Sequence, residues 1–84
     1  MTLYTVVWHF DAQDQLAEIW LASSSRNAVT QAAHRIDTIL GTNPDSKSRP
    51  IADNLRKLTV APLQVLFAVS ESDRIVKIID VATN

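Results

Sequence analysis

The chain has 84 residues, a length that suits one domain over residues 1–84 and no second core. Hydrophobic residues make up 46% of it and glycine occurs once, a composition that excludes disorder and favours a compact fold. Eight Lys and Arg against nine Asp and Glu leave a net charge of −1, which excludes a generic polyanion binder.

Several kinds of chemistry are excluded by residues that the chain lacks. Cysteine is absent, which rules out disulfides, thiolate catalysis and cysteine zinc sites. His9 and His34 are far apart and do not have metal-ligand spacing, so we expect no metal and no cofactor. The start "MTLYTVVWHF" does not resemble a signal peptide, and no apolar run approaches the ~20 residues that span a bilayer. We therefore expect a cytoplasmic protein without a membrane partner.

The first two elements follow each other directly. "LYTVVWHF" is rich in aromatic and β-branched residues and predicts a strand over 3–9. Asp11 is a good N-cap, and Asp14 adds negative charge to the first turn, so a helix is predicted over 12–22. The strand's apolar face, expected on the core, consists of Tyr4, Val6, Trp8 and Phe10.

A second helix follows the "SSS" break, capped by Ser24 or Ser25. Gly41 is expected as the residue just after this helix, with a positive φ angle. The short break between the helices predicts an antiparallel helical hairpin. The helix has one apolar stripe at helical spacing, formed by Val29, Ala32, Ala33, Ile36, Ile39 and Leu40.

The remaining residues predict a long loop and three strands. "TNPDSKSRPIADN" contains two of the three prolines and is expected to be a loop that exposes Lys47 and Arg49. Strands over 55–61, 63–69 and 75–81 are joined by short links, which favours an antiparallel meander. The order β-α-α-β-β-β predicts an α+β fold, with the helical hairpin packed on one face of a small, mainly antiparallel, four-stranded sheet.

This order resembles the RelE/ParE superfamily of toxins from bacterial type II toxin–antitoxin systems. "YTVVWHFDAQDQLAEIW" is similar to the family's opening strand and acidic helix start, and "PLQVLFAVSESDRIVKIIDV" to its closing hairpin. The resemblance spans nearly the whole chain. It implies a small cytoplasmic toxin that inhibits growth and is neutralised by a cognate antitoxin. RelE-like members cleave mRNA on the ribosome, whereas ParE-like members inhibit DNA gyrase.

The residues that RelE-like cleavage uses are only partly matched. Lys57 corresponds to one basic position of the strand before the hairpin, and Arg56 is its neighbour, so both are catalytic candidates. Gln64 stands where the family usually has an arginine, and it carries no charge to stabilise a phosphorane. Asn84 stands where the next basic residue is expected, and the family's terminal Tyr or His has no counterpart in this sequence.

The resemblance therefore leaves three functional hypotheses. The preferred one is a ParE-like toxin that binds an essential target such as gyrase. The alternatives are a ribosome-dependent endoribonuclease using Lys47, Arg49, Arg56 and Lys57, and an inactive toxin-derived binding domain. The residues expected to contact a partner or target are Gln64, Arg49, Lys47, Lys77 and Trp20.

The uncovered face of the sheet also predicts a partner. If Val65, Phe67 and Val69 face the helices, the apolar residues left on the other side are Leu66, Ala68, Val76 and Ile78. An apolar open face is a liability unless another molecule covers it. We expect an antitoxin segment or a second copy of the chain in that place.

Overall fold

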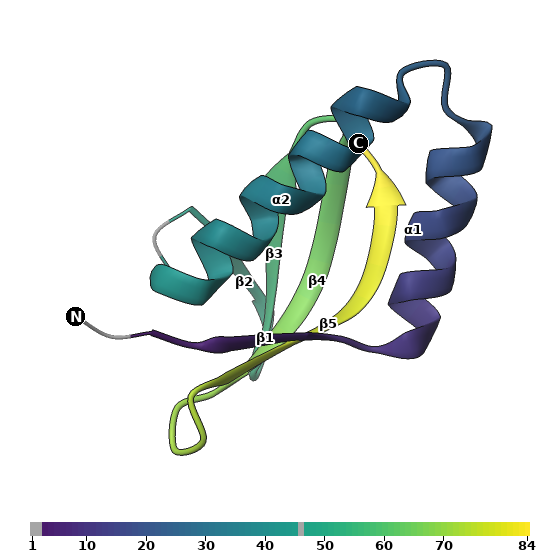
Figure 1. Cartoon of the computed structure of the whole chain (residues 1–84). Helices are drawn as coiled ribbons and strands as arrows, with labels where there is room; N and C mark the ends of the chain where they lie inside the picture. The colour runs from purple at the N-terminus through teal and green to yellow at the C-terminus, as the bar shows by residue number, and fades with distance from the viewer. Residues whose placement is uncertain (1–2, 46) are drawn as a thin grey trace.

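The computed structural model describes residues 3–45 and 47–84, and it places both helices on one face of a single mixed sheet (Figure 1). The sheet order is β1-β5-β4-β3-β2, with β1 parallel to β5 and the other neighbours antiparallel. The predicted α+β class is confirmed. In chain order the elements are β1 (Thr5–Trp8), α1 (Phe10–Ala22), α2 (Arg26–Thr42), β2 (Arg49–Ala52), β3 (Leu55–Val60), β4 (Leu63–Ser70) and β5 (Ile75–Thr83).

The core lies between α2 and the middle of the sheet. The apolar stripe predicted for α2 supplies four fully buried side chains, while α1 supplies only Ala12. β4 contributes alternate residues, as its pattern predicts. The largest buried side chains are Phe67, Ile36, Leu40, Leu58, Leu63 and Ile78.

The sheet has five strands, one more than the sequence predicts. Part of the expected loop forms β2, which pairs antiparallel with β3. Its four residues are all exposed, so no apolar alternation marks the strand, and Pro50 argues against it. Proline is tolerated here because β2 is an edge strand, where one side needs no ladder hydrogen bonds.

The helix boundaries also differ from the prediction. α1 begins at Phe10, and its N-cap is His9 rather than the predicted Asp11. The His9 side chain accepts a hydrogen bond from the backbone N–H of Asp11. Gly41 lies inside α2 without a positive φ, and its carbonyl accepts a 2.7 Å hydrogen bond from the backbone N–H of Tyr4.

In the described residues 3–45 and 47–84, no helix is long and apolar enough to cross a membrane.

The prediction that Val76 and Ile78 lie on the open face is wrong. Both are fully buried, because Val76 pairs with Val69 and Ile78 pairs with Phe67 on the helix side. A register shift follows, after which Val81 pairs with Val65. This bulge lets residues of odd and even number on β5 reach the same core, which simple alternation does not anticipate.

Helix α1 covers the edge of β5 that β1 leaves free. β1 pairs with β5 only as far as Ile78. Beyond it, the Gln15 side chain accepts a 2.9 Å hydrogen bond from the Val81 backbone N–H and donates one of 2.9 Å to the Asp80 carboxylate. The side-chain amide of Gln15 thus supplies a hydrogen-bond partner for the β5 backbone where no neighbouring strand does.

Candidate functional site

The candidate site is the open face of the sheet, where Lys57 and Arg49 come together. Leu58 is buried against the helices, so its neighbour Lys57 projects from the opposite face. The strand register places Arg49 of β2 and Leu66 of β4 directly opposite Lys57, and Asp80 of β5 opposite Leu66. This row across the sheet therefore carries two basic side chains, then the apolar side chain of Leu66 and then the carboxylate of Asp80.

Two further predicted residues lie on this face. Gln64 pairs with Thr59 and donates a long hydrogen bond of 3.4 Å to the Thr83 carbonyl. Lys77 pairs with Ala68 on β4 and with Val7 on β1. The open face thus brings together four of the seven candidates, namely Lys57, Arg49, Gln64 and Lys77.

Arg56 lies on the helix side and stabilises a loop. It pairs with buried Phe67, and its guanidinium donates to the Ser48 hydroxyl at 2.7 Å and to the Ser48 carbonyl at 2.9 Å. Its Nε is also 3.4 Å from the Asp45 carboxylate. These contacts place the Arg56 guanidinium on the helix side of the sheet, whereas Lys57 projects from the opposite face.

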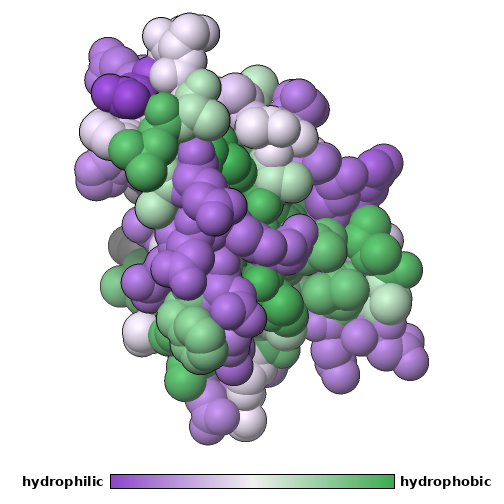
Figure 2. All heavy atoms as spheres, turned by 90° about the vertical axis from the view of Figure 1, so that its right-hand side faces the viewer, coloured by the Kyte–Doolittle hydropathy of each residue, from purple (hydrophilic) through white to green (hydrophobic). Residues whose placement is uncertain are grey.

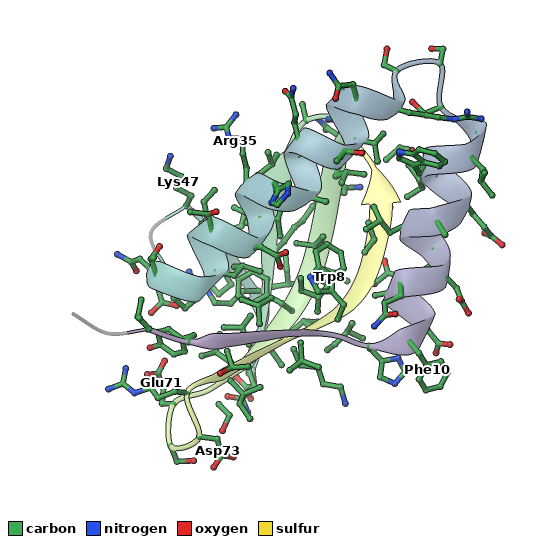
Figure 3. All side chains as sticks on the ribbon, in the orientation of Figure 1. Trp8, Phe10, Arg35, Lys47, Glu71 and Asp73 are labelled. Atoms are coloured by element: carbon green, nitrogen blue, oxygen red, sulfur yellow. The ribbon has the colours of Figure 1, made fainter. Side chains whose placement is uncertain are left out.

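Lys47 also lies away from the open face. It lines a shallow hollow of about 210 Å³ beside α2, together with His34 and Arg35. Figure 3 shows Arg35 and Lys47 pointing to the same side of α2, away from the space between the helices. The hollow lies beside α2 on the helix side of the fold, whereas Lys57 projects from the open face of the sheet.

Trp20 lines a groove between the two helices, which diverge as they leave the connecting loop (Figure 1). Trp20 is 38% exposed, and its indole N–H donates to the Thr30 hydroxyl at 3.2 Å. Trp8 lies in the same groove (Figure 3), where its indole N–H donates to the Asp37 carboxylate at 2.8 Å. The sequence indicates Trp20 as an anchor but does not reveal the groove, which depends on the angle between the helices.

The hairpin between β4 and β5 extends beyond the rest of the sheet (Figure 1), and the Tyr4 side chain contacts its first turn residue. The Tyr4 hydroxyl donates to the Glu71 carboxylate at 2.8 Å, and the Arg74 guanidinium lies 5.4 Å from the tyrosine ring centroid. The hydrogen bond to Glu71 favours the neutral phenol and raises the pKa of Tyr4 above its ordinary value of 10.0.

Two helices on one face of a β1-β5-β4-β3-β2 sheet, with the other face open, define the fold of RelE-type toxins. A chain of the toxin–antitoxin complex RelBE2 from Mycobacterium tuberculosis superposes with a TM-score of 0.82 at 16% identity, covering 100% of this chain and 94% of that one. The isolated RelE toxin of E. coli gives a TM-score of 0.66 at 13% identity, over 95% and 83% of the two chains.

The archaeal RelE–RelB complex from Pyrococcus horikoshii gives a TM-score of 0.63 at 15% identity, over 99% of this chain and 96% of that one. No family model matches the sequence, and no curated protein matches it. The similarity to solved structures therefore shows the RelE/ParE fold, at identities too low to carry over individual residues.

Proposed function

We propose that this chain is the toxin of a toxin–antitoxin pair and that it acts by binding an essential target protein, with DNA gyrase as the first candidate. The observation that carries the proposal is the uncovered sheet face, where apolar side chains are exposed beside basic ones. Val7 is 41% exposed and Ile75 is 36% exposed, and Lys77 lies between them in the register. Apolar residues rimmed by charge are typical of protein-binding surfaces.

Binding is favoured over RNA cleavage because the side chains paired directly with Lys57 do not transfer protons, and the Asp80 carboxylate of the same row is engaged by a hydrogen bond from Gln15. Cleavage by a metal-free toxin needs a group that activates the 2′-hydroxyl and another that protonates the leaving oxygen. The side chains paired with Lys57 are Arg49, whose guanidinium has no acceptor atom, and Leu66, which is apolar. Gln64, two residues from Leu66 along β4 and on the same face, offers hydrogen bonds without charge.

The endoribonuclease remains the second candidate because Arg49 and Lys57 are paired on one face. Two adjacent cations can bind a phosphate and stabilise charge that develops on it. In this mechanism the target is mRNA on the ribosome. Arg49, rather than Arg56, is then the second basic residue that acts with Lys57.

A cognate antitoxin is the partner that we propose for the open face. Two of the similar structures are complexes, namely the toxin–antitoxin complex RelBE2 and the archaeal RelE–RelB complex. An antitoxin segment over Val7, Ile75 and Leu66 would remove their apolar surface from water and block the target surface at the same time. A second copy of the chain is the competing occupant, and light scattering of the purified protein distinguishes the two.

Expression of the chain in bacteria, combined with two purified assays, tests the proposal. We expect growth arrest, inhibition of supercoiling by purified gyrase and no cleavage of transcripts on ribosomes. A double substitution, Arg49→Ala with Lys57→Ala, is compared with Arg35→Ala with Lys47→Ala, which removes the same charge beside α2. Only the first pair is expected to relieve growth arrest.

Three outcomes would contradict this function. Transcript cleavage that depends on Arg49 and Lys57, without an effect on supercoiling, supports the endoribonuclease. Growth arrest with neither activity rules out both gyrase and mRNA as targets. No growth arrest at all identifies an inactive, toxin-derived binding domain.

A further inference from the structure

A groove lies between α1 and α2, on the opposite side of the fold from the open face of the sheet. It encloses about 570 Å³, a volume large enough for several side chains of a partner. Its apolar lining comes from both helices and from β1, and consists of Trp8, Leu16, Ala17, Trp20, Val29 and Ala33.

Asp37 gives this apolar groove a negative charge. One carboxylate oxygen accepts the 2.8 Å hydrogen bond from the Trp8 indole. In the described part of the chain, the ion pairs within 4.0 Å involve Asp11 and Asp45, and none involves Asp37. A carboxylate can accept about four hydrogen bonds, so Asp37 retains the capacity to bind a cation.

The two tryptophans are held so that their rings line the groove. The indole N–H of Trp8 is fixed by Asp37, and that of Trp20 is fixed by Thr30. Trp20 already binds one cation, because the Arg26 guanidinium lies 4.8 Å from its ring centroid and donates to the Trp20 carbonyl at 3.1 Å. Indole rings of this kind bind both the aliphatic stem and the charged head of Lys or Arg.

The charge of α1 favours the same kind of ligand. This helix contains Asp11, Asp14 and Glu18 and no basic residue. Figure 2 shows a hydrophilic band along the side of the molecule that α1 occupies, with apolar patches beside it. None of these three acids lines the groove, so they contribute only a long-range negative field, and Asp37 is the carboxylate that a basic partner segment meets there.

We propose that the groove binds a basic amphipathic helix of a partner protein. A Lys or Arg of that helix pairs with the Asp37 carboxylate, and its apolar residues pack between Trp8 and Trp20. A helix laid between two diverging helices completes a three-helix layer, which is a common mode of helix recognition. The inference does not depend on the proposed toxin activity, since it concerns the other side of the fold.

Two synthetic helical peptides test this proposal with the intact chain. The first has leucines at helical spacing flanked by arginines, and the second has glutamates in place of the arginines. The chain's only two tryptophans both line the groove, so the two indole N–H resonances report on this site. We expect the basic peptide to shift both resonances with saturation, and the acidic peptide to leave them unchanged.

Charge substitutions then locate the contact. Asp37→Asn keeps an acceptor for the Trp8 N–H but removes the charge, and we expect roughly tenfold weaker binding of the basic peptide. Glu18→Gln removes the same charge from α1 outside this groove and is expected to change binding by less than about twofold. Ala17→Arg places a long cation on the exposed rim of the groove and is expected to abolish binding.

Three results would overturn the inference. Equal binding of the basic and acidic peptides would exclude charge recognition. Equal weakening of peptide binding by Asp37→Asn and Glu18→Gln would show that the peptide responds to the protein's overall charge and not to Asp37 in particular. Unshifted indole resonances at saturating peptide would show that the groove does not bind a helix.

Discussion

The two faces of the sheet differ in how closely their side chains are packed. Three consecutive residues of β3 show this difference. Leu58 is 1% exposed and packs under α2. Lys57 projects from the open face beside Arg49, and Arg56 turns back to bind the loop after α2. Three neighbouring residues of one strand therefore lie in the core, on the open face and against a loop.

The comparison indicates where this chain can vary. Residues on the covered face are constrained by volume, because a buried side chain loses both its transfer free energy and its contacts when it is shortened. Residues on the open face are constrained by what binds there. Gln64 illustrates this difference, since its polar amide lies on the open face while its neighbours Leu63 and Val65 are buried on the other.

The largest expected effect compares one leucine from each face. Leu58→Ala removes a fully buried side chain and is expected to lower the free energy of unfolding by about 3 kcal/mol. Leu66→Ala, on the half-buried open face, is expected to cost about 1 kcal/mol. Urea denaturation of both variants measures the difference, and equal losses would contradict the assignment of one packed and one open face.

The next effect separates stability from function in two adjacent basic residues. Arg56→Ala removes the hydrogen bonds to Ser48 and is expected to lower the free energy of unfolding by about 1–2 kcal/mol. Lys57→Ala is expected to change it by less than about 0.5 kcal/mol, because no core contact is lost.

Growth arrest is expected to show the opposite order, with the larger loss for Lys57→Ala. Thermal unfolding and a growth assay of the same two variants measure both quantities. A stable Arg56→Ala variant that has lost toxicity would place Arg56, contrary to this structure, in the functional site.

The features that the sequence predicts correctly arise from local patterns. The stripe from Val29 to Leu40 and the alternation in β4 predict which residues face the core, because each depends only on the period of its own element. β2 is missed since its pattern is polar and contains Pro50. The bulge in β5 is missed because the register is set by the pairing with β4 rather than by β5 alone.

The sequence likewise predicts only those features of the candidate site that depend on a local pattern. Alternation alone separates Lys57 from Arg56. The pairing of Lys57 with Arg49 requires β2, and the groove around Trp20 requires the angle between two helices. These features join residues distant in sequence, and no local period encodes them.

The smallest effect concerns Tyr4, which precedes the edge strand β1 and whose hydroxyl reaches the hairpin. The pKa of Tyr4 is raised above 10.0, chiefly by its hydrogen bond to the Glu71 carboxylate. Since the folded state favours the protonated phenol, this stabilisation is complete below pH 10 and is lost as the pH rises through the folded pKa.

Tyr4 is the only tyrosine, so the absorbance of tyrosinate reports its titration without interference. Glu71→Gln keeps a hydrogen-bond acceptor but removes the charge, so the pKa is expected to fall toward 10.0. Asp73→Gln removes a charge from the same hairpin without touching the phenol and is expected to leave the titration unchanged. If Glu71→Gln has no effect, Tyr4 does not hold the hairpin, and the strands that carry Lys77 and Ile75 are positioned by the sheet pairing alone.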